Sequence, residues 1–254
     1  MTSTESTTID EVEIASIADE LHKAGDYRHL VQSGGSTDKK NYAETLSREL
    51  STRIANDLRS DFPGILPDRD GKMQESRART AKGFKKLDVN YSTSELGLAL
   101  GVSVKTLNFR DGNTDRYTKN FTRIDNELGA ETAGYHERQP YAVMAGVLFL
   151  PLDACDDGSY RTHSLSSFAQ AITIFRPRAG RDRPADSPFL FERLFIALYD
   201  TAPDTFGELI CFDVTDSPPK KGRPRRNVLS YGAMLREIVQ SYDRRNRPPI
   251  DWAD

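Results

Sequence analysis

Residues 87–106 have the sequence LDVNYSTSELGLALGVSVKT, and the order of apolar and polar side chains in this stretch decides the fold that we expect. Leu87, Val89 and Tyr91 alternate with polar residues, which indicates a strand because successive strand side chains point to opposite faces. The same alternation runs from Leu98 to Lys105, after a polar turn at residues 92–95. The stretch therefore predicts an antiparallel hairpin.

One face of the predicted hairpin is polar. Asp88 lies on the first strand, and Ser103 and Lys105 share a face of the second, beside the small residues 99 and 101. A carboxylate and a backbone carbonyl, here that of Val104, are oxygen ligands that Mg²⁺ prefers. A nearby lysine can orient a metal-bound water or offset charge that develops on phosphorus. The hairpin thus carries the groups that cleavage of a phosphodiester requires.

The segments around the hairpin alternate between helical and strand patterns. Apolar residues repeat every four positions from Leu46 to Leu58, which predicts a helix at about residues 44–59, and a second helical pattern covers residues 114–135. Strand patterns follow at residues 141–152, 195–199 and 209–214, residues 164–174 fit a helix or a strand, and residues 230–242 fit a final helix. This order predicts an α/β fold with a mixed central β-sheet flanked by helices.

We expect four parts in the chain. Residues 1–9 are rich in Ser and Thr and predict a disordered N-terminus, and residues 10–216 predict the main domain. Residues 217–229 are basic and Pro-rich and predict a linker, which leaves residues 230–254 as a C-terminal helix and tail.

Composition excludes several classes of protein. The formal net charge of −3 gives no global support for a nucleic-acid partner, so any such argument must be local. Cys155 and Cys211 lie far apart and predict neither a disulfide framework nor a zinc site. The start of the chain lacks the apolar stretch of a signal peptide, and the longest apolar run, residues 141–152, is too short to span a membrane. We therefore expect a cytoplasmic protein with no membrane partner. The sequence also lacks the phosphate-binding loop of NTPases and the G-x-S-x-G motif of hydrolases.

Asp88 followed by Ser103-Val104-Lys105 resembles the PD-(D/E)xK nuclease superfamily, which includes most type II restriction endonucleases. The resemblance covers the chain from the helix at Glu44–Arg59 to Thr106. It departs from the usual pattern at Leu87, where proline is common, and at Ser103, where an acid is common. One branch of restriction enzymes also has S-x-K and takes its second acid from a neighbouring helix. Glu49 is the first candidate for that acid here, Glu131 the second and Glu127 the third.

The resemblance implies a restriction-endonuclease-like core and a Mg²⁺-dependent DNA endonuclease that acts in a restriction system beside a protecting methyltransferase. It implies double-stranded DNA as the partner and a homodimer as the assembly. The implied catalytic residues are Asp88, Ser103, Lys105, Glu49 and Glu131, and the implied metal ligands are Asp88, Glu49 and Val104. The alternative is a non-catalytic DNA-binding or assembly subunit that keeps the nuclease fold. Asp88 and Lys105 would then form a cross-strand ion pair, and the glutamates would lie on solvated helix edges.

Two basic segments are candidates for DNA contacts. The first leads directly into the Asp88 strand and contributes Arg77, Arg79, Lys82, Lys85 and Lys86, although a solvated helix face explains the same pattern. The second, residues 220–226, resembles the AT-hook through Gly222-Arg223-Pro224 and adds Arg223 and Arg225. A basic interdomain linker is the alternative interpretation of this segment.

Overall fold

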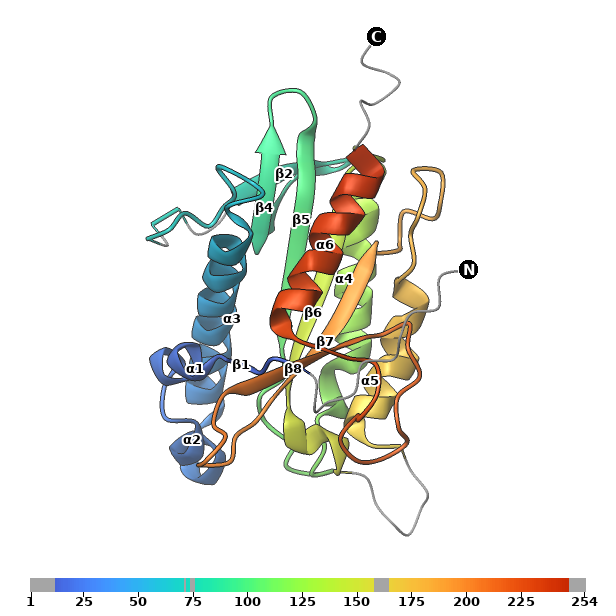
Figure 1. Cartoon of the computed structure of the whole chain (residues 1–254). Helices are drawn as coiled ribbons and strands as arrows, with labels where there is room; N and C mark the ends of the chain where they lie inside the picture. Colours follow the sequence, from blue (N-terminus) through green and yellow to red (C-terminus); the bar gives the residue numbers. More distant parts are fainter. Residues whose placement is uncertain (1–11, 71, 74–75, 158–164, 247–254) are drawn as a thin grey trace.

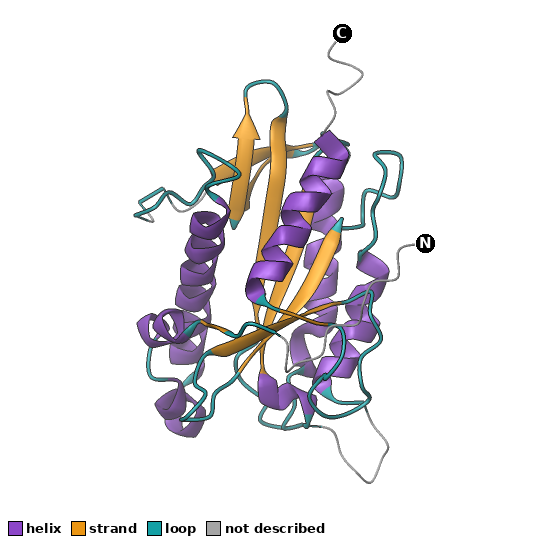
Figure 2. Cartoon of the chain, viewed as in Figure 1, coloured by secondary structure: helices purple, strands orange, loops and turns teal. Residues whose placement is uncertain are grey.

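The computed structural model describes residues 12–70, 72–73, 76–157 and 165–246. It has a mixed α/β fold in which a curled, mixed β-sheet lies between helices on both faces (Figure 1, Figure 2). The predicted disordered start at residues 1–9 and the tail ending in Trp252 lie outside the described residues. The predicted α/β class with a mixed central sheet flanked by helices is confirmed.

Among the described residues, seven strands form the central sheet. Their order is β1 (Ala15–Ser16), β8 (Glu208–Asp213), β7 (Arg193–Tyr199), β6 (Val143–Pro151), β5 (Gly97–Thr106) and β4 (Val89–Thr93), with β9 (Val228–Leu229) paired to β8. β5, β6 and β7 are mutually parallel, and the other pairs are antiparallel. Two connections that contain helices, α4 (Phe121–His136) and α5 (Ser167–Phe175), join the parallel strands, as parallel pairing requires.

The remaining helices complete two layers around the sheet. α3 (Ser36–Leu58) and α6 (Tyr231–Asn246) pack on one face, and α4 and α5 pack on the other (Figure 2). Two short helices, α1 (Ala18–Ala24) and α2 (Tyr27–Ser33), precede α3. The described residues also form the 3-10 helices η2 (Thr118–Asn120), η3 (Leu152–Cys155) and η5 (Arg176–Arg178). No helix within the described ranges is both long enough and apolar enough to cross a membrane.

The leucine repeat of α3 determines how this helix packs. Leu46, Leu50 and Ile54 lie one turn apart, are fully buried, and share a core cluster with Val102 and Val104 of β5. Full burial of each such side chain stabilises the fold by about 1.5–3 kcal/mol. Because the stripe packs directly on β5, it fixes the position of α3 beside the edge of the sheet.

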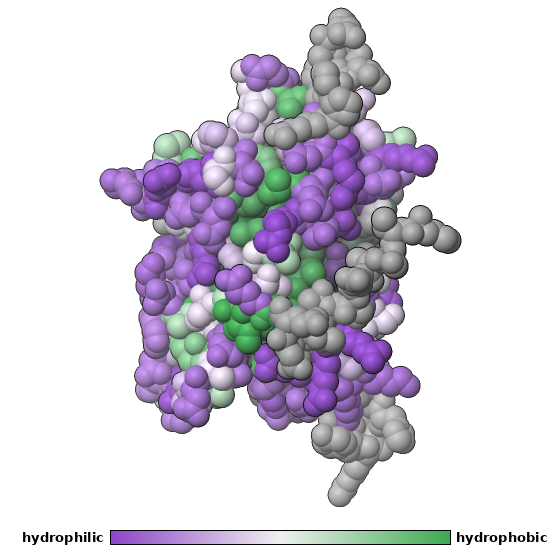
Figure 3. Space-filling model, in the orientation of Figure 1, coloured by the Kyte–Doolittle hydropathy of each residue, from purple (hydrophilic) through white to green (hydrophobic). Residues whose placement is uncertain are grey.

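The C-terminal helix belongs to the same folded unit as the sheet. Met234 and Ile238 of α6 are fully buried in the cluster that includes the α3 stripe. The ring of Phe62, after α3, contacts the rings of Tyr91 and Tyr242 at centroid distances of 5.2 and 4.9 Å. Figure 3 shows apolar side chains between α3 and α6, whereas the outer surfaces of this view are mostly hydrophilic. The predicted linker at residues 217–229 also contributes to the sheet, because β9 lies within it.

Three predicted elements differ from or refine the expectation. β4 and β5 form the predicted antiparallel hairpin, with Val89 opposite Val102. The first strand was predicted to include Leu87 and Asp88, but Leu87 ends β3, Asp88 lies in the bend that follows, and Leu87 and Val89 pack in different core clusters. The basic segment is not a helix: β2 (Ser76–Thr80) and β3 (Gly83–Leu87) form a separate two-stranded sheet. Its inward residues alternate with its arginines, which is a strand pattern. The ambiguous segment at residues 164–174 contains helix α5, which begins at Ser167 after a capping hydrogen bond from the Ala169 N–H to the Ser166 hydroxyl.

Candidate active site

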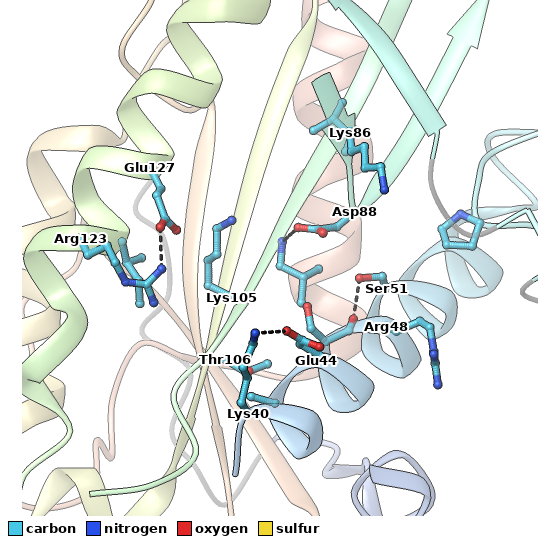
Figure 4. Close-up of a pocket in the computed structure, with 16 residues that line it drawn as sticks. Lys40, Glu44, Arg48, Ser51, Lys86, Asp88, Lys105, Thr106, Arg123 and Glu127 are labelled. Carbon is cyan, nitrogen blue, oxygen red and sulfur yellow. Dashed lines mark hydrogen bonds and ion pairs between the residues drawn. The ribbon is translucent and has the colours of Figure 1, made fainter. Parts of the chain in front are cut away.

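A cleft of about 670 Å³ opens at the edge of the sheet where β4 begins and β5 continues past it. α3 lines one side of the cleft and α4 lines the other, because the two helices cover opposite faces of the sheet. Figure 4 shows Asp88 and Lys105 in this cleft, with Glu44 approaching from α3 and Glu127 from α4. Five basic side chains line the cleft and outnumber the three acidic ones. The basic residues are Lys40, Arg48, Lys86, Lys105 and Arg123. The excess of positive charge suits a phosphate group.

Asp88 lies between β3 and β4, immediately before Val89, where the pairing of β4 with β5 begins. Its Oδ2 accepts a hydrogen bond of 2.7 Å from the backbone N–H of Val104. The carboxylate thus takes the place of a neighbouring strand at this position of β5. Strand geometry points the carbonyl of a residue to the same side as its N–H, so the Val104 carbonyl also points toward the Asp88 side. The N–H of Leu107, an odd-numbered residue just after β5, donates instead to the Phe149 carbonyl of β6 on the opposite side of β5, in agreement with this alternation.

Glu131 of α4 completes the polar cluster from the other face of the sheet. The Ser103 hydroxyl donates a hydrogen bond of 3.1 Å to Glu131 Oε2, and the Lys105 Nζ lies 3.7 Å from the same oxygen. Ser103 is fully buried, and the side chains of Glu131 and Lys105 are 14% and 24% exposed. The Ser103 hydroxyl therefore orients a carboxylate that comes from the helix.

The two carboxyl groups influence one another in a largely buried environment. Burial raises the pKa of Asp88 above its ordinary value, and the Val104 N–H and the Lys105 ammonium oppose this rise. Burial raises the pKa of Glu131 to about 7; the charge of Asp88 adds to the rise, and Lys105 and the Ser103 hydrogen bond oppose it. The positive charge near Asp88 and Glu131 is therefore too small to offset the effect of burial on their carboxylates. A cation placed between them would supply the missing charge.

The donor set fits a magnesium ion held by few protein ligands. Asp88 and Glu131 offer carboxylate oxygens, and Val104 offers a backbone carbonyl. Within the described ranges, no group of three or more His, Cys, Asp or Glu residues gathers in a way that could hold a metal. Mg²⁺ commonly binds through one or two carboxylates and keeps several waters, so two acids and a carbonyl are sufficient for it.

The other two candidate glutamates take different positions. Glu49, the first candidate from the sequence, pairs with Lys23 of α1 at 3.3 Å and with Arg48 at 3.7 Å, and it does not line the cleft. Glu127 lines the cleft and pairs with Arg123 at 2.6 Å (Figure 4). The structure therefore brings Glu131, rather than Glu49, to Ser103 and Lys105.

Several cleft residues were not predicted from the sequence, namely Lys40, Glu44, Arg48 and Arg123. Lys40 pairs with Glu44 at 3.6 Å, and both side chains are exposed at the mouth of the cleft. The small residues Ser47 and Ser51 lie on the same side of α3. Polar and small residues at helical spacing along one face of α3 were the sequence signal that could have identified this side of the cleft.

The basic residues of the first segment lie on the β2–β3 hairpin, which reaches the cleft at Lys86. Arg77, Arg79, Lys82, Lys85 and Lys86 are all exposed on the β2–β3 sheet, and Lys86 lines the cleft beside Asp88 (Figure 4). Lys85 donates a hydrogen bond of 3.3 Å to the Ala130 carbonyl of α4. This sheet therefore joins a basic surface to the candidate site.

The second basic segment lies elsewhere. Arg223 and Arg225 are exposed on a loop beside α5 (Figure 1). The loop is held by hydrogen bonds from the Gly222 N–H to the Cys155 carbonyl and from the Ser166 N–H to the Lys220 carbonyl. Neither arginine lines the cleft.

Comparisons with protein-family models, with curated proteins and with solved structures found no match.

Proposed function

We propose that this protein is a Mg²⁺-dependent DNA endonuclease with a restriction-endonuclease-like core. The observation that carries the proposal is that Asp88, Val104 and Lys105 line one cleft with an excess of basic side chains, while Glu131 lies beside it and contacts Ser103 and Lys105. The meeting of Ser103 with a helix glutamate also agrees with the S-x-K branch that the sequence resembles. The role in restriction, the homodimer and the cytoplasmic location follow from that resemblance or from composition, and they are part of the proposal.

Each residue has a distinct chemical task in this proposal. Bound Mg²⁺ would polarise the phosphoryl oxygen and lower the pKa of a coordinated water. Asp88 and Glu131 would hold the ion, and the Val104 N–H holds Asp88 in place through its Oδ2. Ser103 orients Glu131. Lys105 offsets the negative charge that develops on phosphorus and positions the attacking water, and the basic cleft wall holds the neighbouring phosphates.

The proposal is tested by incubating plasmid DNA with the purified protein in Mg²⁺ or in EDTA. We expect cutting in Mg²⁺ alone, and we expect Asp88→Asn, Glu131→Gln and Lys105→Ala each to lower the rate by at least about 100-fold, because each removes a group that holds the ion or acts on the reacting phosphate. Asp88→Asn keeps an oxygen that can accept the Val104 N–H.

Glu137→Gln is the matched control, because Glu137 is an exposed glutamate at the end of the same helix. It should cut at the wild-type rate. A wild-type protein that binds DNA but does not cut it in Mg²⁺ would instead support the non-catalytic subunit.

A further inference from the structure

The β2–β3 sheet is a two-stranded ribbon with two different faces. Its register places Arg77 opposite Lys86, Ala78 opposite Lys85, and Arg79 opposite Phe84. Opposed side chains in an antiparallel pair share a face. The pair Ala78 and Lys85 therefore lies on an inner face of the ribbon. The pairs Arg77–Lys86 and Arg79–Phe84 lie on its outer face. Five residues per strand make the ribbon about 16 Å long.

The inner face of the ribbon is fixed to α4, the helix that carries Glu131. Ala78 is buried in the core cluster beneath the ribbon. The Tyr135 hydroxyl lies within hydrogen-bond distance of the Lys85 carbonyl (3.2 Å) and of the Lys86 carbonyl (3.4 Å), and the Ala81 N–H donates to the Gly134 carbonyl at 2.9 Å. These contacts hold the ribbon in a defined position relative to the candidate site.

The outer face combines positive charge with an exposed aromatic ring. It consists of Arg77, Arg79, Phe84 and Lys86, so its four side chains carry three positive charges and no carboxylate. Phe84 is 60% exposed, and the Arg79 guanidinium lies 5.3 Å from its ring centre. Lys86 also lines the cleft, so the outer face continues into the candidate active site.

We propose that the outer face of the β2–β3 ribbon enters the major groove of duplex DNA and contacts base edges there. This inference rests on the proposed function, because it names how the nuclease chooses its substrate. The major groove, about 12 Å wide, admits a two-stranded ribbon. Arginine makes the commonest specific contact to guanine, and phenylalanine can contact the methyl group of thymine. Phosphate contacts alone would explain the cations but would leave the exposed Phe84 without a role.

The test selects bound sequences from a pool of random DNA duplexes in Ca²⁺, so that binding is measured without cutting. We expect the wild-type protein to enrich a defined sequence. Arg77→Ala and Arg79→Ala should each weaken discrimination at one base pair by roughly 5- to 150-fold, the size of one bidentate contact. Phe84→Ala should weaken it at a thymine position. All three side chains are exposed, so the variants should fold.

Matched controls are Arg28→Ala on α2 and Phe189→Ala, whose ring is 48% exposed. Both should leave the enriched sequence unchanged. The inference is overturned if Arg77→Ala and Arg79→Ala weaken binding to every sequence equally, or if the protein prefers single strands. Cutting in Mg²⁺ without sequence preference would reject this inference alone, whereas sequence preference without cutting would reject only the proposed nuclease activity.

Discussion

Glu131 combines burial with a position beside a lysine and another acid. In the folded protein its pKa is raised from 4.5 to about 7, mainly by burial. An acid whose pKa is raised binds its proton more tightly in the folded than in the unfolded state. Its contribution to the free energy of unfolding therefore falls as the pH rises from about 4.5 through 7. The residue that we assign to the metal thus destabilises the metal-free fold at neutral pH.

We expect Glu131→Gln to be more stable than the wild type at pH 8, by roughly 1–3 kcal/mol without Mg²⁺. The amide has no charge to bury, and Lys105, which is 24% exposed, can turn its ammonium group to solvent. The difference should disappear at pH 5, where the wild-type carboxyl is protonated. Urea denaturation at both pH values measures it, with Glu137→Gln as the control. A variant that is equally or less stable at pH 8 would contradict this account.

The choice among the glutamates shows what the sequence could predict at this scale. Ser103 and Lys105 follow from strand alternation, which depends only on local geometry, whereas Asp88 lies in the bend between β3 and β4. Glu49 ranked first because it precedes the hairpin and lies beside an apolar stripe, and Glu131 has the same local pattern. The difference between them depends on which neighbour each helix face meets. Glu49 meets Lys23 of α1, and Glu131 meets Ser103 and Lys105.

At the scale of elements, the β2–β3 ribbon depends on its attachment to α4. The Tyr135 hydroxyl is the side-chain link to its backbone, through the Lys85 and Lys86 carbonyls. The basic composition of this segment was evident in the sequence, but its strand structure was not. Arg and Lys are common in both helices and strands, and the inward positions Ala78 and Thr80 of β2 hold only small residues.

We expect Tyr135→Phe to lower the free energy of unfolding by about 0.5–1.5 kcal/mol, the usual net value of a hydrogen bond. Amide hydrogen exchange in β3 should accelerate, because the ribbon loses an anchor. Tyr42→Phe is the matched control, since the buried Tyr42 hydroxyl has no hydrogen-bond partner among the described residues. It should cost nothing in urea denaturation. Equal losses in the two variants would show that the Tyr135 hydroxyl does not anchor the ribbon.

At the scale of the whole molecule, the cleft exists because β4 begins only at Val89, opposite Val102, whereas β5 continues to Thr106 without a strand on that side. Helices on opposite faces of the sheet can then both reach the unpaired length of β5. The sequence predicted the two layers and the mixed sheet, since those follow from apolar periodicity. It could not show that α6 packs in the same core as α3, because an amphipathic helix does not specify its partner.

Binding of Mg²⁺ should stabilise the entire fold by mass action. At a concentration ten times the dissociation constant, the gain is about 1.4 kcal/mol, which corresponds to a rise in melting temperature of roughly 3–5 °C. We expect this rise in the wild-type protein and its loss in Asp88→Asn, measured by thermal denaturation with and without Mg²⁺. A rise of the same size in both proteins would place the ion at a different site.

The hydrogen bond from the Val104 N–H to Asp88 also affects the edge of the sheet, apart from the proposed function. An unpaired strand edge is a template on which another chain can add a strand, and such edges promote aggregation. Asp88 covers this donor of β5 with a charged side chain at the point where β4 no longer does. A protein of this fold without the proposed activity would still gain from an acceptor here. The presence of aspartate at this position in a homologue therefore records protection of the sheet edge as much as it records an active enzyme.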